Sequence, residues 1–201
     1  MNIYYILDLA GTFVFAISGI RLAAEKEMDI FGAIVIGFAT AIGGGTIRDF
    51  LLGSTPVAWI QDIVYLYVII SSVTLGLFFN RYIFELKNTL LIFDSIGLGI
   101  FTISGMQKAL EFGLNVEYAI ILGIITATGG GILRDILANE IPVILRKEIY
   151  ATACLIGSIL FLFLQKIGLN NGINSILTVI LVLIIRTLAV KFNISFPKIK
   201  I

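Results

Sequence analysis

Two stretches of this sequence place glycine and charge in the same order. They are Gly43-Gly44-Gly45-Thr46-Ile47-Arg48-Asp49 and Gly129-Gly130-Gly131-Ile132-Leu133-Arg134-Asp135. Each glycine lowers helix propensity by about 1 kcal/mol relative to alanine, so we expect a helix to break within each triplet. A broken helix frees backbone carbonyl groups, and carbonyl oxygens can replace the water around a dehydrated cation. These stretches therefore favour a cation pathway.

The composition indicates that both stretches lie in a membrane. Of the 201 residues, 59% are hydrophobic and only 13% are charged. A soluble globule has too little polar surface to cover so many apolar side chains. Apolar runs of about 20 residues recur, which is the length that a bilayer requires. The runs are continuous, whereas barrel strands alternate apolar and polar residues. We predict an all-α integral membrane protein.

Hydropathy predicts seven membrane spans with short, charged connections. They cover roughly residues 3–23, 29–52, 61–80, 89–109, 116–138, 148–167 and 173–192, and the second and fifth are interrupted at the glycines. Lysine and arginine gather on one side of the predicted membrane, as at Lys26, Arg81 and Arg146. Because cytoplasmic loops carry this excess, we expect the N-terminus outside and the C-terminus in the cytoplasm.

An internal repeat organises the chain. An offset of 86 residues aligns Asp8 with Asp94 and continues without a gap to Pro56 and Pro142. Such self-similarity indicates a duplicated unit. We predict one membrane domain over 1–201, with repeat one at about 1–84, repeat two at about 87–170 and a seventh helix at about 173–192. Three spans per repeat invert the second copy relative to the first, as in many transport proteins.

The arginine after each triplet needs a partner. A charged side chain costs at least about 2.5 kcal/mol at the bilayer centre. Adjacent helical residues do not face each other, so we do not expect Arg48 to pair with Asp49. By depth, the expected ion pairs are Asp8–Arg48 and Asp94–Arg134. The alternative is that both arginines extend to lipid headgroups. We assign holding or gating of the pathway to Asp8, Arg48, Asp49, Asp94, Arg134 and Asp135.

The two triplets should lie at a similar depth in an inverted repeat and line one narrow path. We expect K⁺ to bind transiently to the carbonyl groups of Gly43–Gly45 and Gly129–Gly131. Hydroxyl groups along this path would come from Ser18, Thr40, Ser104, Thr126 and Thr128. The alternative is that the glycines serve only the close packing of helices.

Other kinds of chemistry find little support. A net charge of +1 gives no case for nucleic acid. Histidine is absent and Cys154 is the only cysteine, which excludes disulfide frameworks and Cys/His metal sites. The glycines lack the Gly-Lys-Ser/Thr of a phosphate loop. We predict a protein that is not an enzyme and has no cofactor, with Cys154 as a small core residue.

Several aromatic residues and one further arginine are interpreted from their position in the spans. The tyrosines, including Tyr65 and Tyr150, lie mostly near predicted span ends, so we interpret them as interfacial anchors. Arg186 lies in the last span and is expected to extend to the cytoplasmic face.

The doubled Gly-Gly-Gly-x-x-Arg-Asp motif, with Pro56 and Pro142 downstream and Asp8 and Asp94 upstream, resembles a prokaryotic membrane family. That family is related to the TRIC (trimeric intracellular cation) channels and is sometimes labelled a glycine transporter family. The resemblance covers nearly the whole chain. It implies seven helices as 3 + 3 + 1, a homotrimer, and in each subunit a potassium pore lined by second and fifth helices that kink at the glycines. Animal members carry a Lys-Glu-Val triplet linked to lipid, which this chain lacks.

The residues and the resemblance together predict a monovalent cation channel, potassium over sodium, in the plasma membrane of a prokaryote. Its expected partners are further copies of itself, membrane lipid and monovalent cations. The alternative is a secondary transporter of a small solute such as an amino acid, because an inverted repeat serves both activities. The charges inside the spans disfavour a purely structural membrane protein.

Overall fold

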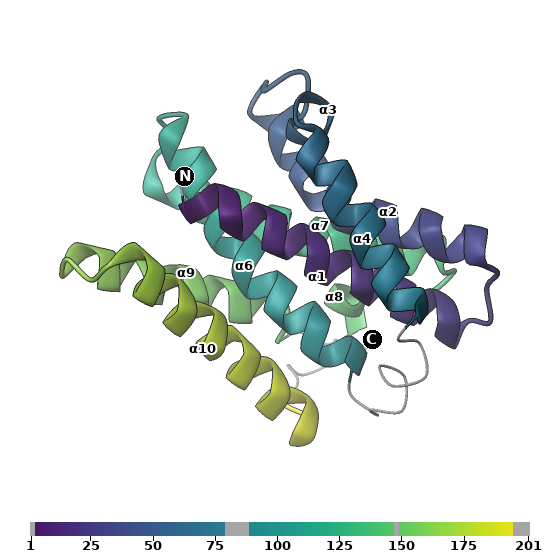
Figure 1. Cartoon of the computed structure of the whole chain (residues 1–201). Coiled ribbons are helices and arrows are strands. Elements are labelled where there is room, and N and C mark those ends of the chain that lie inside the picture. The colour runs from purple at the N-terminus through teal and green to yellow at the C-terminus, as the bar shows by residue number, and fades with distance from the viewer. Residues whose placement is uncertain (1–2, 79–88, 147–148, 195–201) are drawn as a thin grey trace, which may run out of the picture.

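A computed structural model describes residues 3–78, 89–146 and 149–194, and all structural statements below refer to these ranges (Figure 1). The described chain is helical. Its elements are α1 (Ile3–Glu25), α2 (Ile30–Leu51), α3 (Ala58–Gln61), α4 (Ile63–Phe78), α6 (Thr89–Glu111), α7 (Val116–Leu137), α8 (Val143–Arg146), α9 (Ala151–Lys166) and α10 (Asn171–Lys191). The short helices α3 and α8 were not predicted from the sequence.

The long helices fall on the predicted spans, and the protein is an all-helical membrane protein. Of the described helices, α1, α2, α6, α7 and α10 are long and apolar enough to cross a membrane, while α4 and α9 are apolar with 16 residues each. The number of crossings stays a prediction, because the two shorter helices fall below the length of a full span.

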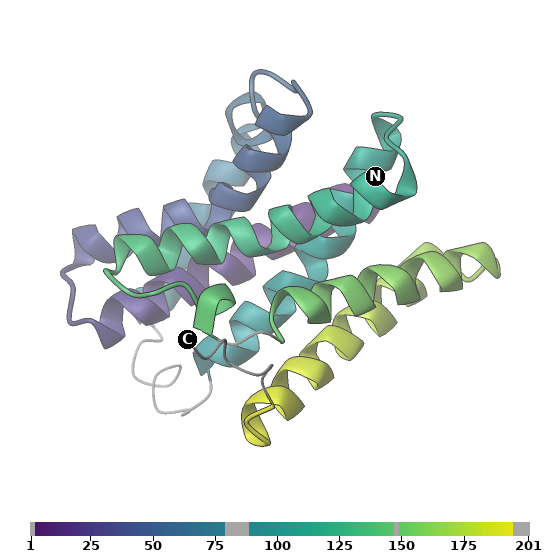
Figure 2. The same cartoon turned by 180° about the vertical axis from the view of Figure 1, so that it is seen from behind.

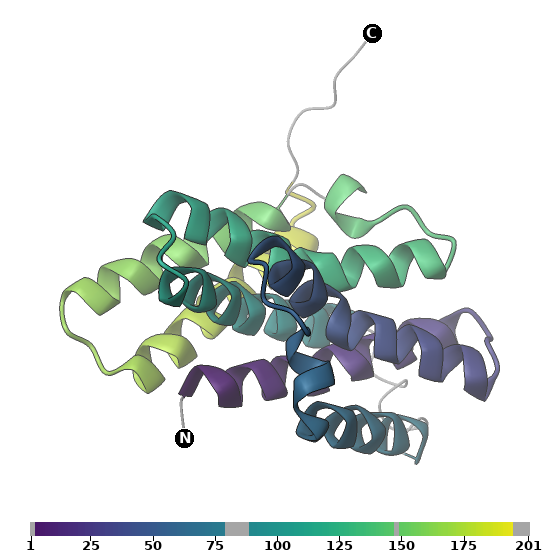
Figure 3. The ribbon, with the colours of Figure 1, turned by 90° about the horizontal axis from the view of Figure 1, so that it is seen from above.

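Four helices form the centre of the molecule. Helix α1 packs against α2 and α6, and α7 packs against the same two helices (Figures 1 and 2). Helix α4 covers α1 on one side, whereas α9 and α10 pack together and cover α6 on the other (Figure 3). The order α1–α2–α3–α4 recurs as α6–α7–α8–α9, which is the arrangement that a duplicated unit predicts.

Both triple glycines lie inside uninterrupted helices, so the prediction that α2 and α7 break there is wrong. Close packing of the two helices outweighs the low helix propensity. A Cβ atom on Gly44 would overlap the backbone carbonyl of Thr126, and one on Gly130 would overlap that of Thr40. Only glycine lets two helix backbones approach this closely. We call this contact the glycine seam, and the packing alternative accounts for it.

The predicted pathway threonines lie in helix contacts. The hydroxyls of Thr40 and Thr126 each donate to the backbone carbonyl four residues earlier at 2.6 Å, and that of Thr128 does so at 2.9 Å. The space beside Gly19 of α1 is taken by Thr40, and the space beside Gly105 of α6 by Thr126. The pairs α1–α2 and α6–α7 therefore meet at equivalent positions of the two repeats.

The core between α1 and α6 is aromatic. Phe15 and Phe101 are fully buried and their ring centroids lie 5.1 Å apart. Each ring also fills the space left by a glycine of the opposite helix, Phe15 against Gly97 and Phe101 against Gly11. This dry contact occupies the middle of the molecule. Cys154 belongs to the same buried cluster as Phe15, which confirms its prediction as a core residue.

Candidate functional site: two buried charge clusters

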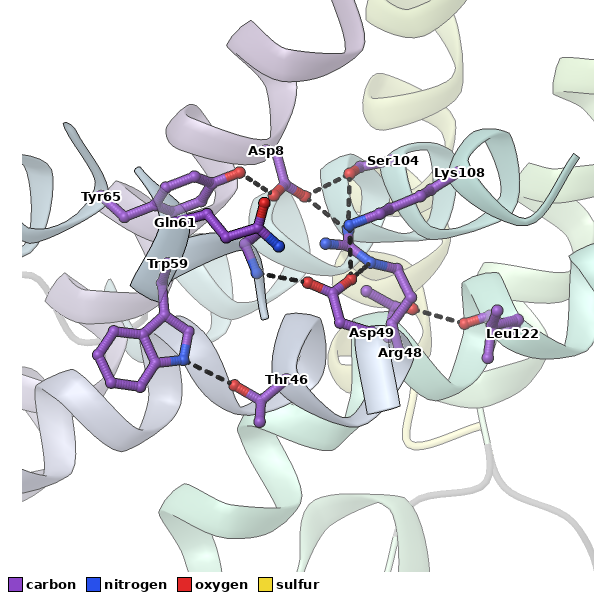
Figure 4. A network of polar contacts seen from close by, with 12 residues as sticks. Asp8, Thr46, Arg48, Asp49, Trp59, Gln61, Tyr65, Ser104, Lys108 and Leu122 are labelled. Atoms are coloured by element: carbon purple, nitrogen blue, oxygen red, sulfur yellow. Dashed lines mark hydrogen bonds and ion pairs between the residues drawn. The ribbon is translucent and has the colours of Figure 1, made fainter. Parts of the chain in front are cut away.

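The first charge cluster joins α1, α2, α4 and α6 (Figure 4). Asp8 Oδ1 lies 2.9 Å from Arg48 Nη1, which is the ion pair that the repeat predicts. The other carboxylate oxygen of Asp8 accepts a hydrogen bond from the Tyr65 hydroxyl at 2.6 Å. Ser104 donates to Asp8 Oδ1 and lies 3.3 Å from Arg48 Nη1. Because Arg48 is 1% exposed, this cluster holds its charges away from lipid.

Asp49 extends the first cluster. Arg48 Nε donates to Asp49 Oδ1 at 2.8 Å, so the expectation that these adjacent residues do not pair is wrong. The arginine side chain is long enough to reach both its neighbour and Asp8. The same Asp49 oxygen accepts from Lys108 Nζ at 2.7 Å. Its second oxygen accepts from the backbone N–H of Ala58, the first residue of α3, at 2.8 Å.

The second charge cluster repeats this arrangement from the other half of the chain. Arg134 Nη1 lies 2.7 Å from Asp94 Oδ1 and donates to the Ser18 hydroxyl at 2.6 Å. The Tyr150 hydroxyl donates to Asp94 at 3.2 Å. Arg134 Nε also donates to Asp135 at 2.9 Å. Both arginines are thus buried bridges between two carboxylates, and the headgroup alternative does not hold for either of them.

Each aspartate that follows an arginine also positions a short helix. Asp135 accepts from the backbone N–H of Val143, the first residue of α8, at 2.8 Å, just as Asp49 accepts from Ala58 of α3. A carboxylate suits the first turn of a helix, where backbone N–H groups lack partners. The Arg-Asp pair therefore links the end of a long helix to the segment that follows it.

The two clusters lie towards opposite ends of an antiparallel helix pair. Asp8, near the start of α1, contacts Ser104, near the end of α6. Ser18, further along α1, contacts Arg134 of α7, which is paired with Asp94 near the start of α6. Ten residues of helix separate Asp8 from Ser18, about 15 Å at the rise of an α-helix. Both predicted serines thus join charge clusters, each contributed by the repeat opposite to its arginine.

Each cluster faces a cavity of its own. The first vestibule has a volume of about 300 Å³ and is lined by polar side chains that include Tyr4, Tyr5, Asp8, Arg48, Asp62, Tyr65, Ser104, Lys108 and Glu111. The second vestibule has about 310 Å³ and is lined by residues that include Leu22, Glu25, Lys26, Arg134, Asp135, Glu140, Val143 and Arg146. Thr40, Thr126 and Thr128 line neither of these two cavities.

The sequence interpretation missed three members of the site. Tyr65 and Tyr150 are buried and donate hydrogen bonds to Asp8 and Asp94, so their prediction as interfacial anchors is wrong. Arg186 is 3% exposed, donates to a backbone carbonyl in the segment before α9 and lies 4.6 Å from the Tyr150 ring centroid. Its prediction as a headgroup contact is therefore also wrong. The tyrosines are 85 residues apart, so a one-residue gap after Pro142 would have aligned them.

An ionic strap lies at the mouth of the second vestibule. Glu140, in the connection between α7 and α8, pairs with Lys26 and lies 2.5 Å from Arg146 Nη2. The hydrogen bond from Lys26, together with that from Arg146, holds the pKa of Glu140 below its ordinary value. The equivalent positions at the other end, with the one-residue gap after Pro142, are Phe112, Ser54 and Gln61, so the charged strap belongs to one end only.

Acid is expected to release this strap. Because the folded pKa of Glu140 is depressed, its pairing contributes stability above the unfolded value of about 4.3 and loses it as the pH falls further. The thermal midpoint of the wild type should exceed that of Glu140→Gln at neutral pH, and the difference should close below about pH 4. Melting both proteins in detergent across this range measures it. A difference that does not change with pH would show that the strap contributes nothing through its charge.

Comparisons with known proteins agree with this geometry. The chain matches a protein-family model described as glycine transporter over residues 5–81 and 91–166. It is 44% identical to the UPF0126 membrane protein of Vibrio cholerae, covering 98% of this chain and 82% of that protein. It is 41% identical to the UPF0126 inner membrane protein YadS of Escherichia coli, covering 96% and 94%.

Solved structures share the fold over the full length. The chain is 37% identical to the TRIC trimeric intracellular cation channel orthologue from Rhodobacter sphaeroides, with a TM-score of 0.84 and coverage of 96% of this chain and 100% of that one. A second structure, from work on conductance through TRIC cation channels, is 38% identical with a TM-score of 0.83 and coverage of 100% and 98%. This chain therefore belongs to the UPF0126 membrane-protein family, which the glycine-transporter model describes, and it has the fold of the TRIC cation channels.

Proposed function

We propose that this protein is a cation channel that conducts potassium in preference to sodium. Its likeness to TRIC cation channels, in sequence and in fold over almost the whole chain, carries the proposal. We further propose a homotrimer with one pathway in each subunit, in a plasma membrane with the N-terminus outside. The trimer is supported by the TRIC name of the Rhodobacter protein, and the membrane by the Escherichia coli relative, which is named an inner membrane protein.

The proposed pathway connects the two vestibules between α1, α2, α6 and α7. Such a pathway requires an entrance at each end. The two vestibules lie at opposite ends of one helix pair, and each reaches a buried charge cluster. The Phe15–Phe101 contact and the glycine seam of Gly44 and Gly130 occupy the space between them. Conduction therefore requires these contacts to separate. Separation of the seam would expose the backbone carbonyls that it buries, in the region where we expect transient binding of K⁺.

The charge clusters are proposed to hold this pathway closed or open. Each cluster ties three helices of the central four together, and each includes a residue from both repeats. A shift of α2 against α6 has to rearrange the contacts of Arg48, and a shift of α7 against α1 those of Arg134. Both guanidinium groups are buried, so during such a shift their ion pairs with the aspartates would be weakened in a place where lost pairing is costly.

A secondary transporter is the second candidate. It is favoured by the description of the matching family model as glycine transporter. The first vestibule also presents both carboxylates and ammonium or guanidinium groups, the pair of charges that a zwitterionic solute would meet. An inverted repeat is compatible with either activity.

Purified protein in planar bilayers separates the two candidates. We expect single-channel current steps and, in a tenfold KCl gradient, a reversal potential that approaches about 59 mV towards the potassium equilibrium, the value for one charge. With KCl on one side and an equal concentration of NaCl on the other, a reversal potential displaced from zero towards the potassium equilibrium would indicate preference for potassium. Saturable glycine uptake into liposomes without unitary currents would instead support the transporter. A reversal potential at the chloride equilibrium, or currents from protein-free membranes, would contradict the channel.

A further inference from the structure

We propose that the ammonium group of Lys108 occupies a cation site on Asp49 at the inner end of the first vestibule, and that it makes the access of cations to Asp49 and Asp135 unequal at the two ends of the pathway. The inference rests on the proposed channel function. It assigns a role to a residue that lies outside the repeated motif and whose counterpart in the first repeat, Leu22, carries no charge.

The geometry places Lys108 between the cavity and the carboxylate. Lys108 Nζ lies 2.7 Å from Asp49 Oδ1, and the side chain of Lys108 is 24% exposed whereas that of Asp49 is 1% exposed. Lys108 lines the first vestibule. A cation that enters this cavity therefore meets an ammonium group before it can reach Asp49.

The second cluster provides an internal comparison. The offset of 86 residues aligns Lys108 with Leu22 and Asp49 with Asp135. Both Leu22 and Asp135 line the second vestibule, and within the described ranges the ion pair of this carboxylate is with Arg134 and not with an ammonium group. The two cationic groups at that mouth, Lys26 and Arg146, are paired with Glu140 instead.

The clusters consequently differ in their direct ion pairs. In the described part of the chain, the ion pairs of the first cluster join two carboxylates to two cations, and those of the second join two carboxylates to one cation, while Arg186 lies over the Tyr150 ring instead. The members are Asp8, Asp49, Arg48 and Lys108 in the first, and Asp94, Asp135 and Arg134 in the second. Among the described residues, the aspartate that follows the arginine is therefore covered by an ammonium group in the first cluster and is not covered by one in the second.

Lys108 is also better suited to leave its site than Arg48 is. Arg48 is held by Asp8, Asp49 and Ser104 at once. The described contacts of Lys108 consist of a single ion pair. Its charge is a compact ammonium on a flexible four-carbon stem. Lys108 can therefore exchange with a permeating cation on Asp49 without taking the buried pairs apart.

The first test removes the ammonium. Lys108→Met is expected to raise the potassium conductance on the order of two- to tenfold at low KCl, because the vestibule then concentrates cations. The gain should shrink at high KCl, where salt screens the charge. Lys166→Met, a change of an exposed lysine at the end of α9, is the matched control and should leave the conductance unchanged. Equal conductance of Lys108→Met and wild type at low KCl would overturn the proposal.

The second test restores the charge from one side. In a Lys108→Cys variant, a positively charged aminoethyl thiosulfonate reagent attaches a short ammonium, and a neutral methyl reagent does not. We expect the charged reagent to lower the raised conductance from the first-vestibule side only, with recovery after reduction. Lys108→Cys alone also covers the case in which Lys108→Met does not fold. An equal effect of both reagents would overturn the proposal, because the block would then be steric.

A third measurement does not depend on conduction. If Asp49 holds the Lys108 ammonium, Asp49→Asn should speed the labelling of Lys108 by an amine-reactive reagent, read by mass spectrometry, while labelling of Lys166 stays the same. Faster labelling in a protein that carries no current would refute the channel and retain the site. An unchanged labelling rate would refute the site, whatever the currents show.

Discussion

Arg134→Gln is expected to lower the free energy of unfolding by about 3–5 kcal/mol, the usual cost of removing one partner of a buried ion pair. Arg134 is 1% exposed and bridges Asp94 and Asp135. Glutamine leaves these two buried carboxylates without the counter-charge of Arg134. Chemical denaturation in detergent, followed by circular dichroism, measures the change.

A double-mutant cycle assigns this loss to the pair. Asp94→Asn alone should cost less than Arg134→Gln, because Arg134 keeps Asp135 and Ser18 as partners. The double variant should be less unstable than the sum of the single variants. Arg146→Gln is the matched control, since that arginine is about half exposed and its surface pair contributes little. Strictly additive losses would contradict an energetic coupling between Arg134 and Asp94.

Neighbouring glycines of the first triplet are expected to respond in opposite directions to alanine. Gly44→Ala places a methyl group on the backbone carbonyl of Thr126, which cannot move without displacing α7. We expect a loss of at least the 1–3 kcal/mol that is typical of overpacking, about 3 kcal/mol or more here. Gly45→Ala meets only the end of the Arg48 side chain, at 3.7 Å. Alanine there should stabilise the helix by up to about 1 kcal/mol.

Thermal midpoints of the two variants in one detergent test this contrast. Gly130→Ala is the control from the other repeat and should resemble Gly44→Ala, because its methyl group would overlap the carbonyl of Thr40. Equal tolerance of alanine at Gly44 and Gly45 would show that the helices separate at little cost. In that case the seam could not be the contact that keeps the pathway closed.

The antiparallel packing of α1 against α6 explains why each cluster draws on both repeats. Ser104 comes from the second repeat and joins the first cluster, while Ser18 comes from the first repeat and joins the second. Motion between the repeats therefore acts on the two clusters together. The proposed channel would open by relaxing a central contact made of the glycine seam and the Phe15–Phe101 pair.

Much of the fold could be predicted from the sequence, because the free energy of placing a helix in the membrane depends mainly on the composition of that helix. Apolar runs have to be buried in lipid, so the limits of the long helices followed from hydropathy. The Asp8–Arg48 and Asp94–Arg134 pairs followed as well, since an arginine inside a span needs a partner and the repeat supplied one at matching depth.

The remainder was decided by contacts between segments far apart in the sequence. Helix propensity predicted a break at the glycines, but the approach of α2 to α7, which no local pattern encodes, keeps both helices continuous. Hydropathy placed Tyr65 and Tyr150 at an interface, whereas the packing of α4 and α9 directs their hydroxyls onto buried carboxylates. The sequence by itself determined a membrane helical repeat with two buried charge pairs. Only the tertiary structure decided that the glycines close a seam and that Lys108 covers one aspartate, because both depend on distances between helices.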